Sequence, residues 1–153
     1  MSKINTFLAF EKNGVEAMEL YTSLIPNSKI ISVHKSEGGP IPAGALMHGI
    51  FELDGQTFMA MDGGPHFKFS EAASIFVYCE TQEEVDRLWN ALTADGGEES
   101  MCGWLKDKYG VSWQIIPKQL IDLMSGPDRE RAGRVMQAML QMRKIDIKTI
   151  EEA

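Results

Sequence analysis

The sequence predicts an α+β fold made of two copies of a βαβββ unit, followed by C-terminal helices. Segments with strand-like apolar runs and segments with helical spacing follow one another in the order strand, helix, several strands, and this order occurs twice. Each half also contains a hairpin turn, ending at Gly55 or Gly110, that is followed by an apolar strand. Neither unit is large enough to cover its own sheet, so we expect the two units to pair, either within one chain or between the two chains of a dimer, and we expect residues 1–153 to form a single domain.

The first unit is expected over residues 3–62. An apolar, aromatic run predicts a strand over 4–10, and apolar residues three and four apart predict a helix over 14–24. Three strands should follow, over 29–34, 44–53 and 56–61. The dipeptide Asp54-Gly55 favours a tight hairpin turn between the last two strands.

The second unit is expected over residues 72–117, with strands over 74–79, 104–106 and 112–116. Between the first two, residues 81–94 read as a helix, because Thr81 and Glu84 fit a capping box and Val85, Leu88, Trp89 and Leu92 form one apolar face. A helical extension should occupy 118–152. It contains a short helix, a longer helix opened by Pro127-Asp128, and a last turn after Asp146.

Composition and charge exclude several function classes. A net charge of −7, with 15 dispersed basic residues, disfavours a nucleic-acid partner. No apolar run approaches the roughly 20 residues of a membrane span, and the N-terminus lacks the pattern of a secretory signal. Cys79 and Cys102 are too few for a disulfide framework or a four-thiolate zinc site, and fit free thiols. We therefore expect a cytoplasmic protein with no membrane partner.

Several segments, taken in order, carry a family resemblance: residues 4–10 (INTFLAF), Glu16-Ala17 with Tyr21, 26–28 (PNS), 102–104 (CGW), 110–114 (GVSWQ) and 142–147 (MRKIDI). They resemble the PhnB-like branch of the vicinal oxygen chelate superfamily, which includes glyoxalase I, extradiol dioxygenases, and fosfomycin and bleomycin resistance proteins. The resemblance runs from residue 3 to about residue 152. It implies that the paired modules form a cupped, incomplete mixed β-barrel and that the protein is a homodimer.

Members of this branch often carry the name 3-demethylubiquinone-9 3-methyltransferase. Methyl transfer from S-adenosylmethionine usually needs a Gly-rich turn between a strand and a helix of a parallel sheet. The glycine pairs of this chain, Gly38-Gly39 and Gly63-Gly64, instead adjoin prolines in loops. We therefore do not expect methyl transfer, and we expect no cofactor.

The resemblance also implies where a metal would bind. Superfamily enzymes hold a metal with His, Glu or similar ligands at matching points on four strands, and aligning the strands places these points at Asn5, Met59, Ser74 and Gln114. None of these side chains is an imidazole or a carboxylate, and neutral amides and hydroxyls compete poorly with water for such cations. We therefore expect no metal site.

A cup without a metal can still bind a molecule. Strand alternation would direct about half of the abundant aromatic residues into the cup, and neutral polar groups there need hydrogen-bond partners. His48 lies on a strand whose alternate residues would face the cup, and His66 would border its mouth. The expected ligand-binding residues are Asn5, Phe7, His48, Met59, Ser74, Phe76, Trp104 and Gln114.

Three functions are open at this point, and we prefer the first. The chain is a metal-independent protein that binds a small molecule in the aromatic-lined cup. Alternatively, it is a metal-independent isomerase, lyase or transferase acting on a small oxygenated metabolite, with His48 or one of Glu52, Asp62 and Asp107 as general base. The third alternative is a metalloenzyme whose ligands lie outside the aligned points. No residue is assigned a catalytic role by the sequence.

Overall fold

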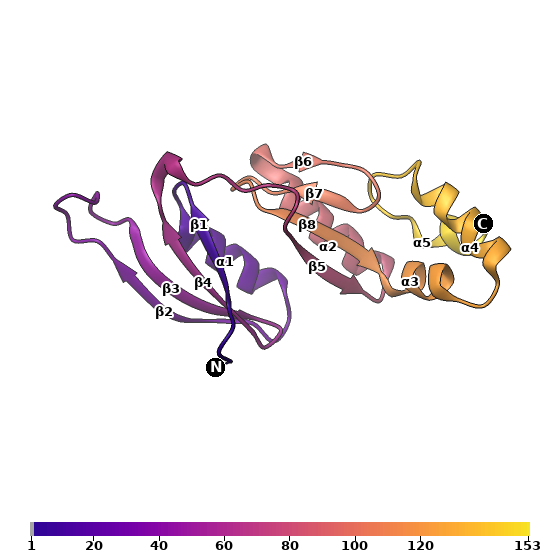
Figure 1. The fold of residues 1–153 in the computed structure, drawn as a ribbon, viewed down its shortest axis with the longest axis horizontal. Coiled ribbons are helices and arrows are strands. Elements are labelled where there is room, and N and C mark those ends of the chain that lie inside the picture. Colours follow the sequence, from indigo (N-terminus) through magenta and orange to yellow (C-terminus); the bar gives the residue numbers. More distant parts are fainter. Residues whose placement is uncertain (1) are drawn as a thin grey trace. The chain divides into compact units, whose positions relative to one another are not determined.

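The computed structural model describes residues 2–153, which form two compact units, one ending at Lys68 and the other comprising Phe69–Ala153. Each unit contains one open, four-stranded mixed sheet with a helix against one face (Figure 1). The strand orders, β1-β4-β3-β2 and β5-β8-β7-β6, are the same arrangement twice. The predicted α+β class and the internal repeat of a βαβββ unit are confirmed.

The first unit follows the predicted order of elements. Its elements are β1 (Thr6–Phe10), α1 (Gly14–Leu24), β2 (Lys29–Lys35), β3 (Leu46–Leu53), β4 (Gln56–Asp62) and the short 3-10 helix η1 (Gly64–His66). β1 runs parallel to β4, whereas β2, β3 and β4 are antiparallel neighbours. Asp54 and Gly55 have positive φ angles of 48° and 81°, as expected for the turn between β3 and β4.

Helix α1 covers one face of the first sheet. Met18 and Tyr21 of α1 are fully buried, as is Phe51 of β3. Gly49 of β3 permits the close approach, because a Cβ atom there would lie 2.7 Å from Met18 Sδ. The predicted strand over 4–10 begins two residues later than expected, because the Asn5 amide instead donates to the Ser2 carbonyl oxygen at 3.0 Å in a local turn.

The second unit repeats this pattern with shorter outer strands. Its elements are β5 (Ser74–Cys79), α2 (Gln82–Thr93), the 3-10 helix η2 (Ala94–Gly96), β6 (Glu98–Glu99), β7 (Trp104–Lys106) and β8 (Ser112–Pro117). The Thr81 hydroxyl oxygen accepts a hydrogen bond from Glu84 N at 3.2 Å, which confirms the predicted N-cap. The Glu84 carboxylate bonds to Glu80 N instead of Thr81 N. The two-residue strand β6 is too short to leave a periodic signal and was not predicted.

Three C-terminal helices complete the second unit: α3 (Lys118–Ser125), α4 (Arg129–Met139) and α5 (Ile147–Glu151). They bury a cluster made of Ile116, Leu120, Val135, Ile145 and Ile150. Asp128 and Asp146 cap α4 and α5, which begin where the sequence predicts the longer helix and the last turn. Within residues 2–153, no helix combines the length and the apolar character that crossing a bilayer would require.

The C-terminal segment is also bonded to the loop before β7. Cys102 N and Gly103 N donate to the carbonyl oxygens of Met142 and Arg143, each at 2.8 Å. Lys144 Nζ lies 2.9 Å from Asp86 Oδ1 on α2, and this hydrogen bond, together with one from Gln82, holds the pKa of the Asp86 carboxyl below its ordinary value. The two backbone hydrogen bonds fix the backbone immediately before Trp104.

Candidate functional site

Each sheet has one face against its helix and one face turned away from it, which we call the open face. Residues directly opposite on neighbouring strands share a face, so the register assigns each side chain. In the first sheet, Phe7 is paired with Met59 and Met59 with Ile50. All three alternate with the buried residues that pack on α1, so they belong to the open face. His48, two residues before Ile50, lies on this face as well.

The open face of the second sheet carries an aromatic row. Trp104, Gln114 and Phe76 are direct neighbours on β7, β8 and β5. They alternate with Trp113 and Ile115, which are fully buried on the side of α2. Phe76 is 40% exposed, and its ring meets the ring of Tyr78 edge-on, with centroids 4.8 Å apart. This face therefore presents aromatic surface that the second unit does not bury.

The two open faces correspond position by position. The pair Phe7–Met59 in the first unit matches Phe76–Gln114 in the second, in the same parallel register. Asn5 and Ser74 each lie two residues before the aromatic member of the pair. In the second unit the resulting diagonal neighbours touch, because Gln114 Nε2 donates to Ser74 Oγ at 2.9 Å.

Each half of the expected ligand-binding set thus lies on the open face of its own sheet, or immediately before it in the case of Asn5. Phe7 is 48% exposed, whereas His48, Met59, Ser74, Trp104 and Gln114 are half-buried. The side-chain amide oxygen Oδ1 of Asn5 is buried without a hydrogen-bond partner among the described atoms. It is therefore an acceptor with unused capacity beside the open face.

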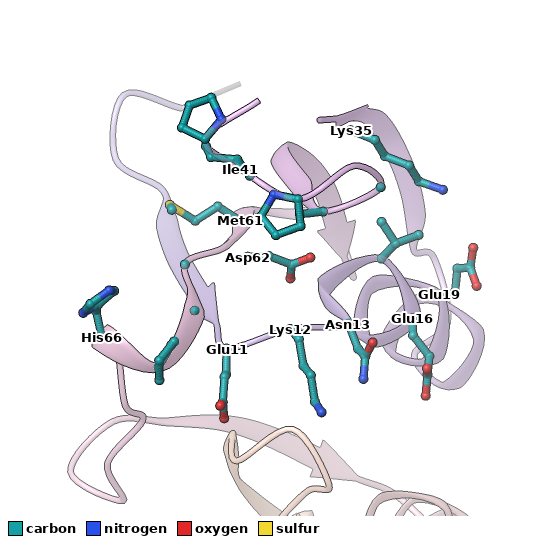
Figure 2. Close-up of a pocket in the computed structure, with 18 residues that line it drawn as sticks. Glu11, Lys12, Asn13, Glu16, Glu19, Lys35, Ile41, Met61, Asp62 and His66 are labelled. Atoms are coloured by element: carbon teal, nitrogen blue, oxygen red, sulfur yellow. The ribbon is translucent and has the colours of Figure 1, made fainter. Parts of the chain in front are cut away.

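A pocket of about 980 Å³ lies elsewhere in the first unit, at the start of α1 and under the loop before β3. None of the eight expected ligand-binding residues lines it, although His66, expected at the cavity mouth, does. Figure 2 shows the Asp62 carboxylate near the middle, with Glu11 and Lys12 toward one side and Lys35 toward another. Apolar walls come from Val15, Ile41, Met61 and three prolines.

Asp62 has a structural role in this pocket. Its Oδ1 accepts a hydrogen bond from Gly14 N at 2.8 Å, and its Oδ2 accepts one from Leu46 N at 2.9 Å. The Asp62 carboxylate, at the end of β4, therefore caps the N-terminus of α1. Asn13, at the N-cap position itself, makes no side-chain cap hydrogen bond. A carboxylate with both oxygens bonded to the backbone is a poor general base, so Asp62 does not fit that role.

The other two carboxylates considered as bases are engaged as well. Asp107 is 2% exposed; its Oδ1 accepts from Tyr109 N and Val111 N, and its Oδ2 accepts from Trp113 Nε1 at 2.9 Å. It therefore organises the turn before β8. Glu52 lies 3.8 Å from Lys29 Nζ on the neighbouring strand.

The two cysteines are free and differ in environment. Cys79 is fully buried at the end of β5, and burial, reinforced by the charge of Glu84, raises its pKa to about 12. This thiol is therefore neutral and unreactive at ordinary pH. Cys102 is half-buried in a loop and has a positive φ of 60°.

One pair of neighbouring side chains was not predicted from the sequence. His34 and His48 are direct cross-strand partners on β2 and β3, so both imidazoles lie on the open face of the first sheet. Their separation in sequence gives no helical or strand spacing, and only the pairing of β2 with β3 brings them together. A β-bulge beside this pair, at Met47, made their register unreadable from alternation alone.

Comparisons with known proteins identify the family of this chain. A family model described as 3-demethylubiquinone-9 3-methyltransferase matches residues 2–116, which include both sheets. The chain belongs to this family. The helices α3 to α5 lie beyond the part that the family model matches. No curated protein matches the chain significantly.

Solved structures show the same fold. A PhnB protein from Bacillus cereus is 42% identical, with a TM-score of 0.71, and the match covers 76% of this chain and 99% of that chain. A protein from Pseudomonas aeruginosa is 24% identical, covering 76% and 98%, with a TM-score of 0.63. A fosfomycin resistance protein, FosX, from Listeria monocytogenes, complexed with Mn(II) and 1S,2S-dihydroxypropylphosphonic acid, is 16% identical, covering 75% and 91%, with a TM-score of 0.51. The expected PhnB-like family is confirmed, and the structures of lower identity share its fold.

The four aligned points of this chain do not fit a divalent metal. Ser74 and Gln114 offer a hydroxyl and an amide that already bond to each other, and Met59 offers a thioether. In the described part of the chain, no three His, Cys, Asp or Glu side chains are grouped so that they could hold an ion. The function proposed below therefore uses no step at a metal.

Proposed function

We propose that this chain is a metal-independent small-molecule-binding protein whose ligand occupies the open faces of its sheets. The residues that would contact it are Asn5, Phe7, His48, Met59, Ser74, Phe76, Trp104 and Gln114. One observation carries the proposal: the row Trp104–Gln114–Phe76 combines aromatic surface with an amide whose orientation is fixed by Ser74. Apolar walls with a few oriented polar groups are typical of small-molecule sites.

The pocket of Figure 2 supports this choice by contrast. Both oxygens of its innermost carboxylate, that of Asp62, already accept hydrogen bonds from backbone N–H groups. The open face of the second sheet and the residue just before β1 keep unused polar capacity among the described atoms, at the Ser112 hydroxyl and the side-chain oxygen Oδ1 of Asn5. Buried polar atoms without partners favour a site where a ligand or water completes the hydrogen bonds.

We further propose that the two units act as one domain and that the protein is a cytoplasmic homodimer. The two free thiols suit a reducing compartment. Phe7, Phe76 and Tyr78 are each at least 40% exposed, and aromatic surface of this kind is commonly covered by a ligand or by a second subunit. Sedimentation equilibrium would give twice the chain mass of 17.1 kDa, and a monomer at micromolar concentration would contradict the dimer.

Ligand binding is tested with a panel of neutral aromatic compounds in a thermal-shift assay, followed by titration calorimetry of the compounds that raise Tm. Phe76→Ala should weaken a bound compound by about threefold to tenfold, which corresponds to the loss of one aromatic contact. Phe67→Ala is the matched control, because Phe67 is 51% exposed and lies outside both open faces.

Two binding results would overturn the proposal. One is a panel in which no compound binds; the other is a bound compound that loses affinity in Phe67→Ala but not in Phe76→Ala. Chemical conversion of a bound compound that disappears in His48→Ala would replace it with the enzymatic alternative. His48 is the half-buried imidazole of the open face and is therefore the informative position.

A further inference from the structure

The open face of the second sheet holds a small polar pocket of about 130 Å³. Glu71, Glu98, Trp104, Lys106 and Ser112 are among the residues that line it. At roughly 30 Å³ per water molecule, this volume equals about four waters, so it suits a ligand with only a few heavy atoms. No residue of this pocket except Trp104 was expected from the sequence to contact a ligand.

The register explains why these side chains meet. Glu98, Lys106, Ser112 and Ser74 are direct neighbours on β6, β7, β8 and β5. They therefore form a polar row across the open face, next to the aromatic row that contains Trp104. The row places one ammonium, one carboxylate and two hydroxyls side by side.

Ser112 is the buried end of this pocket. It is 2% exposed, and its hydroxyl oxygen has no hydrogen-bond partner among the described atoms. A buried hydroxyl without a hydrogen-bond partner is unfavourable, so a polar group of a ligand in the pocket would stabilise Ser112 by bonding to it. The neighbouring hydroxyl of Ser74 cannot be assigned this role, because it already accepts from Gln114 Nε2.

Charges of both signs remain available at the pocket. Lys106 Nζ lies 4.0 Å from Glu71 Oε1, which is beyond hydrogen-bond distance. Glu98 contributes a second carboxylate on the polar row. Glu99, which also lines the pocket, is used within the protein: Trp89 Nε1 donates to its Oε1 at 2.6 Å, and Arg143 lies 3.6 Å from its Oε2.

We propose that this pocket binds a small zwitterion of the α-amino-acid class. Lys106 and the Ser112 hydroxyl donate hydrogen bonds to the ligand carboxylate, Glu71 and Glu98 accept hydrogen bonds from its ammonium group, and Trp104 packs against its short aliphatic part. A ligand with both charges matches the mixed lining better than a simple anion or cation, because either would meet a like charge. The inference rests on the proposed function, since it names the class of ligand for part of the same open face.

The test compares three compounds with one carbon skeleton: L-alanine, L-alaninamide, which lacks the carboxylate, and propionate, which lacks the ammonium group. Titration calorimetry or ligand-observed NMR should show alanine binding at least tenfold more tightly than either analogue, because each analogue forfeits one charged contact. Equal affinity for alanine and one analogue would overturn the proposal, as would an absence of binding by all three.

Substitutions then assign the contacts. Lys106→Gln and Glu98→Gln should each weaken alanine about tenfold or more, and Lys106→Arg should retain most of the affinity. Ser112→Ala should weaken both propionate and alanine. Lys108→Gln, a charge change in the nearby exposed turn outside the pocket lining, is the control and should have no effect.

The design separates this inference from the function on which it rests. If an aromatic compound binds in a manner that depends on Phe76 while all three alanine compounds are silent, the zwitterion pocket is wrong and the proposed function stands. If neither series binds, both are wrong. Affinity for alanine that survives Lys106→Gln and Glu98→Gln places the compound elsewhere and also overturns the inference.

Discussion

Asp107 provides a quantitative test of how the second unit is held together. Its carboxylate accepts three hydrogen bonds, from Tyr109 N, Val111 N and Trp113 Nε1, at 2.9, 3.0 and 2.9 Å. In Asp107→Asn one of the two oxygens becomes an N–H₂ group that cannot accept. Either the turn or the fully buried Trp113 indole then keeps a donor without a partner.

The expected loss follows from the burial of this group. An unsatisfied buried donor costs about 1–3 kcal/mol, and the remaining bonds lose the strength that the charge gave them. We expect a total of about 3 kcal/mol, or a decrease in Tm of roughly 6–12 °C for a chain of this length.

Urea unfolding followed by tryptophan fluorescence measures this loss directly, because Trp89, Trp104 and Trp113 all lie in the second unit. Asp54→Asn is the matched control: Asp54 lies in the equivalent turn of the first unit with φ 48°, a conformation that Asn adopts as readily. The control should change stability by less than about 0.5 kcal/mol. If Asp107→Asn unfolds at the same urea concentration as the wild type, the structural role of Asp107 is refuted.

Three further predictions follow from single contacts. Gly103→Ala should destabilise the protein strongly, because its φ is +84° and the added Cβ would lie 2.7 Å from the Ile116 side chain. Gly133→Ala, in the middle of α4, meets open space and should stabilise the protein by about 0.5–1 kcal/mol. Urea midpoints in the opposite order would contradict this packing. A thiol reagent at pH 8 should label Cys102 but not Cys79 until the protein is unfolded, and two fast-reacting thiols in the native protein would be inconsistent with the raised pKa. The lowered pKa of Asp86 means that its ion pair stabilises the fold above the ordinary carboxyl pKa and that this stabilisation is lost as the pH falls through the lower, folded-state value. The stability gap between the wild type and Asp86→Asn should therefore narrow below about pH 4, and a constant gap from pH 6 to pH 3 would refute the effect.

The fold could be predicted because its determinants are local. The Asp54-Gly55 turn, the helical spacing over residues 14–24 and the Thr81 cap each act within a few residues, and the repeat then fixed the order of the elements. The strand β6 has only two residues and is held by pairing with β7. It is too short to show the alternating pattern from which a strand is predicted.

The candidate site could be predicted only in part. Alternation along one strand places Ser74 and Phe76 on the same face, because the side-chain period is two. The roles of Asp62 and Asp107 depended on partners in loops and other strands, and as isolated carboxylates they resembled possible bases. The polar row from Glu98 to Ser74 depends on the register of four strands, which a single sequence does not contain.

The central claim is that the open faces of this family member work without a divalent metal. Elemental analysis of untagged protein, purified without chelator and dialysed against metal-free buffer, tests it most directly. We predict only traces of zinc, iron, manganese and nickel relative to protein. A stoichiometric amount of any of these ions, retained after dialysis and lost in Gln114→Ala but not in His34→Gln, would contradict it.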